Sequence, residues 1–98
     1  MREAYLRIHL EIIERESKGN PIAKKALEHI LNRTRNFSIN DIYSIPQNSD
    51  PRRLPLEQLK QYDKIIVCGA YHGMCLNVAS ITLTLNSISN ELDEYGIL

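Results

Sequence analysis

The chain has no excess of charge of either sign. Its 98 residues contain twelve Lys and Arg and twelve Asp and Glu, which gives a formal net charge of zero at pH 7. Proteins that hold nucleic acid mainly through its phosphates, or that bind anionic membrane surfaces, carry a marked basic excess. The charge balance therefore argues against nucleic acid as a partner and against a role at a membrane surface.

Cysteine is scarce as well, and both copies lie in the most apolar part of the chain. Small secreted domains that rely on disulfides need several cysteines in a chain of this size. Only Cys68 and Cys75 are present here. We therefore expect two reduced thiols in a cytoplasmic protein.

No segment has the pattern of a signal peptide or of a membrane span. Residues 1–16 interleave Glu and Arg with apolar residues, which a signal peptide does not. Residues 65–90 contain no Asp, Glu, Lys or Arg, and their longest apolar run is 65–70. That run is far shorter than the roughly 20 residues of a transmembrane helix, so the segment is predicted to be buried core. The whole chain, 1–98, is expected to form one domain.

The first third of the chain has helical periodicity. Over residues 2–18 the apolar side chains gather on one face, and acidic residues precede basic ones at four-residue spacing. Gly19 suits the end of this helix, and Asn20 and Pro21 suit the capped start of another. A second amphipathic pattern covers 21–34. These features predict an N-terminal helical hairpin.

One segment in the middle of the chain is compatible with two structures. Residues 37–45 have apolar side chains at alternate positions, which favours a strand. Ser38 followed by Asp41 also resembles the capping box of a helical turn. Three prolines make 46–55 a loop, and a short helix is predicted over 55–61.

The clearest strand covers residues 63–70. A continuous apolar run of this kind is typical of a strand covered on both faces in a parallel sheet. Spacings of three and four then favour a long helix over 73–92, although 81–85 also alternates as a strand would. Residues 95–98 suit a short final strand. The predicted fold is α/β: an N-terminal helical hairpin packed on a small parallel sheet of two or three strands, with a long C-terminal helix.

The junction between this strand and the following helix is where chemistry can be placed. Ligands of open parallel sheets bind where a strand ends and a helix begins. The free N–H groups and dipole of the helix favour an anion there and can lower the pKa of a thiol. Cys75 falls in the first turn of the predicted helix, where a thiolate could act as a nucleophile.

Val67, Cys68 and Gly69, followed by Cys75 six positions after the glycine, resemble the nucleophile segment of isochorismatase-like cysteine hydrolases. The resemblance spans about residues 63–80. It implies a flavodoxin-like three-layer fold, hydrolysis of an amide or ester, and Cys75 as the nucleophile. The family also uses an Asp and a Lys at other strand ends, and no strand predicted near the start of this chain ends in Asp.

Spacing argues against other site chemistries. A low-molecular-weight tyrosine phosphatase needs an arginine where Met74 stands, and the glycines lack the basic residue of a phosphate-binding loop. His72 and Cys75 stand three apart, but the other two histidines fall on separate predicted helices. We therefore predict no metal site and no cofactor.

The leading hypothesis is a protein that binds another protein or a copy of itself, because a complete set of nucleophile, base and orienting group is absent. A small domain with a charge-free segment of 26 residues has more apolar surface than its own core hides. An inhibitor, an immunity or antitoxin-like factor, or a phage accessory protein would act by occluding its partner. The expected contacts are Arg52 and Arg53 in the 46–55 loop, with Tyr71 and His72. A hydrolase that uses Cys75 is the alternative.

Overall fold

The computed structural model describes all 98 residues and contains one four-stranded, all-parallel sheet. The strands lie in the order β2-β1-β3-β4. Their bounds are β1 (Glu3–Ile8), β2 (Ile42–Ile45), β3 (Lys64–Gly69) and β4 (Asn90–Ile97). The helices are α1 (Leu10–Glu16), α2 (Pro21–Thr34), α3 (Leu56–Leu59) and α4 (Cys75–Leu85), with a short 3₁₀ turn η1 (Ile39–Asp41).

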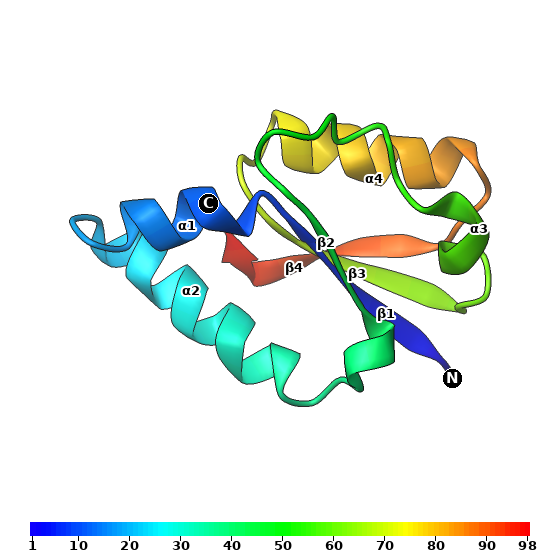
Figure 1. Cartoon of the computed structure of the whole chain (residues 1–98), viewed down its shortest axis with the longest axis horizontal. Helices are drawn as coiled ribbons and strands as arrows, with labels where there is room; N and C mark the ends of the chain where they lie inside the picture. Colours follow the sequence, from blue (N-terminus) through cyan, green and yellow to red (C-terminus); the bar gives the residue numbers. More distant parts are fainter.

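Helices cover both faces of the sheet, which makes three layers (Figure 1). α1 and α2 lie on one face, and α3 and α4 lie on the other. The central strand β3 shows how one short segment serves both layers. Ile65 and Val67 join the core under α4, while Ile66 and Cys68 join the core under α1 and α2. This double burial is why the strand has a continuous apolar sequence.

The predicted architecture is wrong in its strand number and at both ends of the chain. The sheet has four strands instead of two or three, and the C-terminal strand β4 begins at Asn90, inside the helix predicted over 73–92, instead of being confined to 95–98. The first element is the strand β1 instead of a helix. Each error has a local physical cause.

At the N-terminus, the predicted hairpin over 2–18 and 21–34 is replaced by β1 followed by α1 and α2. β1 lies in the sheet between β2 and β3, with Leu6 and Ile8 fully buried. His9 then adopts a left-handed backbone with φ of 52° and separates β1 from α1. A strand buried on both faces does not alternate, so its apolar residues merge with those of the next helix into one apparent helical pattern.

At the C-terminus, α4 ends at Leu85, well before residue 92. Ser87 has a positive φ of 60°, and the N–H of Ile88 donates to the carbonyl of Leu83 at 2.9 Å. The chain therefore turns back toward the sheet, where Leu92 of β4 pairs with β3. Ile88 and Leu92 continue the helical spacing in sequence although neither lies in the helix.

The segment 37–45 contains both of the structures that its sequence suggested. The side chain of Ser38 accepts a hydrogen bond from the N–H of Asn40 at the start of η1. The strand β2 follows and occupies only the last part of the segment. After the 46–55 loop, α3 is also shorter than the predicted helix over 55–61.

Candidate functional site

The carboxyl edge of the sheet, where all four parallel strands end, brings together the loops that carry the predicted contact residues. The connection after β1 leads to one side of the sheet and the connection after β3 leads to the other. Ligands of open parallel sheets bind where the connections diverge in this way. The loop after β2, residues 46–55, holds the two predicted arginines, and the loop after β3, residues 70–74, holds Tyr71 and His72.

Gly69 allows β3 to approach β1 closely at this edge. Its φ is +123°, and a Cβ atom there would lie 1.9 Å from the carbonyl oxygen of Ile8. The N–H of Ala70 donates to that same oxygen at 3.0 Å, and the peptide bond between Ala70 and Tyr71 is cis. Because only glycine fits this backbone, the loop over 70–74 leaves the sheet directly beside the end of β1.

Cys75 is the first residue of α4 and is half-buried. The N–H of Leu76 donates to the carbonyl of Tyr71 at 3.3 Å, whereas the N–H groups of Cys75 and Asn77 have no backbone acceptor. Free N–H groups in the first turn of a helix can hold a negative charge. The sulfur itself makes no hydrogen bond to an ionisable side chain. The site thus has a thiol and donor groups, without a base in contact with the thiol.

The other thiol belongs to a different environment. Cys68 lies on β3 and points into the core under α1 and α2. Its burial raises its pKa to about 12. A thiol with this pKa is almost wholly protonated at neutral pH and is a poor nucleophile. Any thiol chemistry at the carboxyl edge therefore falls to Cys75.

His9 is a residue of this edge that the sequence pattern did not identify. It follows β1 directly, is 4% exposed, and its Nε2 lies 3.0 Å from the carbonyl oxygen of Ser49. Its N–H donates to the carbonyl of Ile45 at 2.9 Å. His9 therefore joins the 46–55 loop to the end of β1. The sequence pattern over 2–18 did not single it out, because the apolar residues of β1 and α1 on its two sides form one apparent helical pattern.

Arg52 and Arg53 are both exposed but differ in their contacts. The guanidinium of Arg52 forms an ion pair with Asp50 at 2.7 Å, and hydrogen bonds from Arg52 lower the pKa of Asp50 to about 2. Arg53 forms no ion pair and lines a hollow of about 330 Å³ together with Pro46 and Asn48. Of the two, Arg53 has the side chain that is available to a partner.

The outward side of α4 is apolar. Its inward side is buried against the sheet by Leu76, Ala79 and Leu83. Val78, Ile81 and Leu85 occupy the opposite side, and the exposed Met74 comes just before the helix. We call these four apolar residues the α4 seam. Met74, Ile81 and Leu85 are 63%, 58% and 79% exposed. The seam is therefore an apolar stripe facing solvent.

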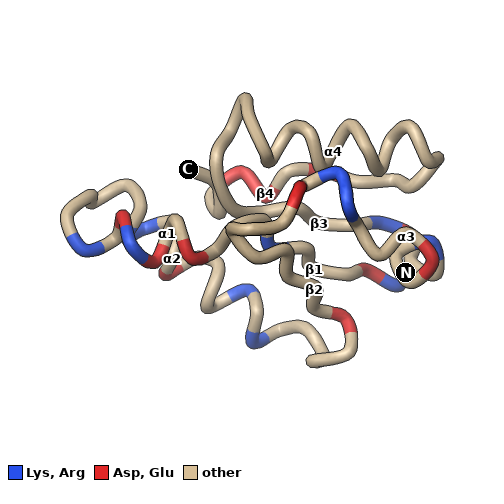
Figure 2. The backbone as a smooth tube through the Cα atoms, turned by 45° about the horizontal axis from the view of Figure 1, so that its top comes forward, with Lys and Arg blue, Asp and Glu red and all other residues tan.

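The helix that carries the α4 seam is free of charge, and the 46–55 loop lies on the same face of the sheet. The tube of α4 carries no charged residue in Figure 2, in agreement with the charge-free sequence of 65–90. The 46–55 loop runs alongside α4 on the same face of the sheet in both views (Figures 1 and 2). Leu54 of this loop and Cys75 of α4 pack against the same core. The loop that carries Arg52 and Arg53 therefore lies on the same face of the sheet as α4.

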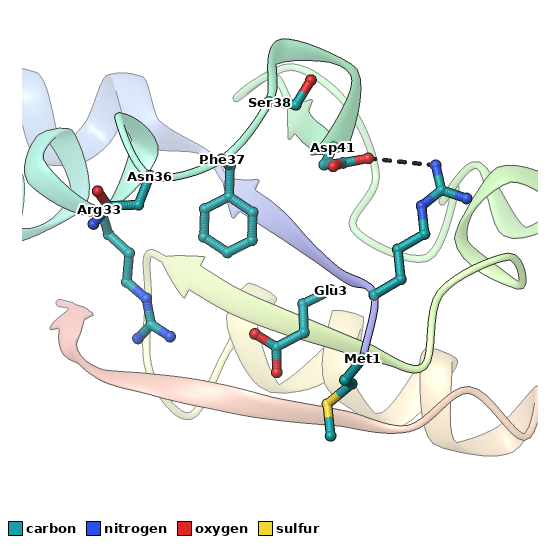
Figure 3. Close-up of a pocket in the computed structure, with 8 residues that line it drawn as sticks. Met1, Glu3, Arg33, Asn36, Phe37, Ser38 and Asp41 are labelled. Atoms are coloured by element: carbon teal, nitrogen blue, oxygen red, sulfur yellow. Dashed lines mark hydrogen bonds and ion pairs between the residues drawn. The ribbon is translucent and has the colours of Figure 1, made fainter.

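The largest hollow lies at the opposite edge of the sheet. It has a volume of about 470 Å³ and is lined in part by Arg33, Phe37 and Glu3 (Figure 3). Its polar wall carries both signs of charge, and Arg2 lies 3.5 Å from Asp41. Cys75 lines none of the hollows in the structure, and no group of three potential metal ligands is present. The predicted nucleophile and the largest hollow are thus separate.

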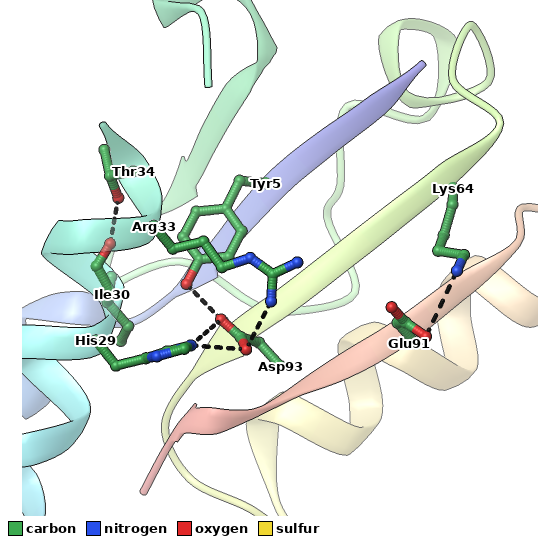
Figure 4. Close-up of polar contacts among 8 residues, drawn as sticks. All are labelled: Tyr5, His29, Ile30, Arg33, Thr34, Lys64, Glu91 and Asp93. Atoms are coloured by element: carbon green, nitrogen blue, oxygen red, sulfur yellow. Dashed lines mark hydrogen bonds and ion pairs between the residues drawn. The ribbon is translucent and has the colours of Figure 1, made fainter. Parts of the chain in front are cut away.

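A buried carboxylate joins the α2 layer to the sheet. Asp93 of β4 accepts hydrogen bonds from the hydroxyl of Tyr5 at 2.7 Å, from Nε2 of His29 at 2.9 Å and from Nη1 of Arg33 at 3.0 Å (Figure 4). Three donors satisfy a carboxylate that is 4% exposed. We interpret this cluster as structural, since it lies on the other side of the sheet from the α4 seam.

No protein-family model matches this chain, and comparisons with curated proteins and with solved structures gave no significant match. None of the helices combines the length and the apolar character needed to cross a membrane.

Proposed function

We propose that this chain is a protein-binding domain whose docking surface is the α4 seam. The observation that carries the proposal is the exposure of Ile81 and Leu85 on a charge-free side of α4, together with that of Met74 just before the helix. Contiguous apolar patches on soluble proteins mark interaction sites more often than chance exposure does. Covering this stripe removes apolar surface from water, which is favourable by about 25 cal/mol per Å².

The rim of the seam also suits a protein partner. Interfaces combine an apolar centre with a polar rim. Arg53 in the neighbouring loop has no ion pair, so its guanidinium can meet a carboxylate of the partner. His72, in the turn before α4, is exposed. Tyr71 is half-buried and packs against the core under α2, so we assign it a supporting role for the turn.

Binding of this kind acts by occlusion. α4 and its rim would cover the working surface of the partner, as an inhibitor, an immunity or antitoxin-like factor, or a phage accessory protein does. The support is the combination of an exposed apolar surface with a thiol that contacts no base. Both features favour steric action over chemistry.

A photoreactive amino acid placed at Ile81 tests the proposal. In the cell that makes the protein, illumination should attach a protein to this position. The matched control is the same amino acid at Ile22, which is 69% exposed on α2. An adduct at position 81 that is absent at position 22 supports the proposal. Equal labelling at both positions, or no adduct at position 81, contradicts it.

A second candidate is a cysteine hydrolase, which the free N–H groups of Cys75 and Asn77 favour. The thiolate of Cys75 would attack the carbonyl carbon of an amide or ester, and the N–H groups would stabilise the oxyanion. Cleavage of the C–N or C–O bond would release the amine or alcohol, protonated by water, and leave a thioester. Water would then hydrolyse the thioester to the carboxylic acid and the free thiol. Loss of a measurable turnover in Cys75→Ser, together with fast alkylation of Cys75, would support this candidate. A Cys75 that resists iodoacetamide at neutral pH would rule it out.

A further inference from the structure

The largest hollow, at the amino edge of the sheet, has one charged group in its wall without a partner. Its volume of about 470 Å³ is that of a small-molecule site. Glu3, the first residue of β1, lines the hollow and is half-buried, and its carboxylate forms no ion pair. The side chain of Glu3 points into the space that Phe37 and Arg33 border (Figure 3). A half-buried carboxylate of this kind favours a cation beside it.

The two arginines of the wall are engaged by other carboxylates. Arg33 donates to the buried Asp93 at 3.0 Å. On the other side of the hollow, Arg2 lies 3.5 Å from Asp41. Each arginine therefore compensates a charge other than that of Glu3.

Lys64 of the neighbouring strand β3 is engaged as well. It stands opposite Glu3 in the pairing of β1 with β3, but its ammonium lies 3.5 Å from Glu91 (Figure 4). Met1, at the rim of the hollow, is 91% exposed and its amino group forms no ion pair. Each of the three basic side chains thus has its own carboxylate, and the carboxylate of Glu3 is the one left over.

The rest of the wall suits an organic cation. Phe37 stacks on Tyr5 with the ring centroids 5.2 Å apart, which holds its ring in place at the hollow. An aromatic ring attracts an ammonium group and also packs against a hydrocarbon stem. Asn36 and Ser38 add side-chain oxygens to the wall. A primary ammonium has three N–H donors and no acceptor, so carboxylate, amide and hydroxyl oxygens are its natural partners.

We propose that this hollow binds a primary ammonium group on a short hydrocarbon stem, with the ammonium at Glu3 and the stem along Phe37. A free alkyl amine and the lysine side chain of a protein share this chemistry. The hollow lies beside the end of α2, on the other face of the sheet from the α4 seam, so the inference is independent of the proposed docking surface. Because a single ion pair at a half-exposed site contributes little in water, we expect dissociation in the millimolar range.

NMR titration of the full chain with n-pentylamine tests the inference. The backbone signals of Asn36, Phe37 and Ser38 should shift and saturate in the millimolar range. 1-Pentanol, which has the same stem without the charge, should bind at least about fivefold more weakly. Glu3→Gln keeps the shape of the side chain and should weaken binding of the amine by the same factor. Glu94→Gln makes the matched change at an exposed position on β4 and should leave the dissociation constant unchanged.

Three results would overturn the inference: signals that do not move at millimolar amine, pentanol that binds as well as pentylamine, or a Glu3→Gln variant that binds like wild type. The comparison of the two probes uses the wild-type chain, so it does not depend on the folding of a variant. Nα-acetyl-lysine amide then identifies the source of the ammonium. Binding equal to that of pentylamine supports a lysine side chain of a protein, and binding of pentylamine alone supports a free amine.

Discussion

Tyr5 and Asp93 stand 88 residues apart in the chain and share a hydrogen bond of 2.7 Å. The bond joins the third residue of the central strand β1 to the edge strand β4, and α2 contributes the other two donors to the same carboxylate. Burial raises the pKa of Tyr5 far above its ordinary value, so its hydroxyl stays protonated and can donate over the whole pH range in which proteins fold. The carboxylate of Asp93 therefore links β1, α2 and β4.

Tyr5→Phe should lower the free energy of unfolding by about 1.5–3 kcal/mol, the usual contribution of a hydrogen bond to a charged group. The phenyl ring keeps the stacking on Phe37, whose centroid lies 5.2 Å away, so the loss reports the hydroxyl. Urea denaturation measures it. Tyr95→Phe is the matched control, because Tyr95 is 71% exposed. Similar losses in the two variants would show that the contact with Asp93 contributes little.

Gly69→Ala should destabilise the fold by at least about 3 kcal/mol, because the new Cβ meets backbone and the φ is unfavourable for any other residue. Gly19→Ala should change the stability by no more than about 0.5 kcal/mol, because a Cβ there meets no atom within 4 Å. Thermal or urea unfolding of the two variants gives the comparison. A Gly69→Ala protein as stable as wild type would mean that β1 and β3 do not meet in this register.

The two thiols should differ in reactivity. In the folded protein at neutral pH, iodoacetamide should label the half-buried Cys75 well before Cys68, whose pKa is raised to about 12 by burial. Peptide mapping by mass spectrometry locates the label. After unfolding in denaturant, both residues should be labelled at similar rates. Labelling of Cys68 first in the folded protein would contradict its position on β3.

The carboxyl group of Asp50 should titrate near pH 2 in the folded protein, against an ordinary value of 3.8. Since its folded pKa is lowered, the interaction with Arg52 stabilises the folded loop above about pH 4 and is lost as the pH falls toward 2. NMR titration of the side-chain carboxyl carbon measures the midpoint. In Arg52→Gln the midpoint should return toward 3.8. An unchanged midpoint would show that the ion pair does not form in solution.

The central strand β3 can be predicted from local sequence, but β1 cannot. Residues 65–70 form a continuous apolar run rich in β-branched side chains, which suits a strand buried on both faces. The residues of β1 are equally compatible with a helix, because Glu3 and Arg7 stand at the spacing of a helical ion pair. In the structure Arg7 instead bonds Ser44 of β2 at 2.9 Å. Strand pairing with distant segments decides between the two.

Some features of the candidate site can likewise be predicted from local sequence, and others cannot. The position of Cys75 at the start of a helix can be predicted, because a strand, a glycine turn and a helical spacing follow one another in the sequence. The end of that helix cannot, because the chain leaves it through the positive φ of Ser87 and turns back to pair β4 with β3. The exposure of the α4 seam is likewise a tertiary result, since helical spacing alone does not show which side of α4 the sheet covers.

By itself, the sequence determined the neutral charge, the charge-free segment 65–90, and the strand-to-helix junction that contains Cys75, because all three are properties of neighbouring residues. Only the tertiary structure decided that residues 3–8 form a strand, that Tyr5 meets Asp93, and that Ile81 faces solvent. Each of those depends on contacts between segments far apart in the chain, and the free energy of such contacts outweighs local preference.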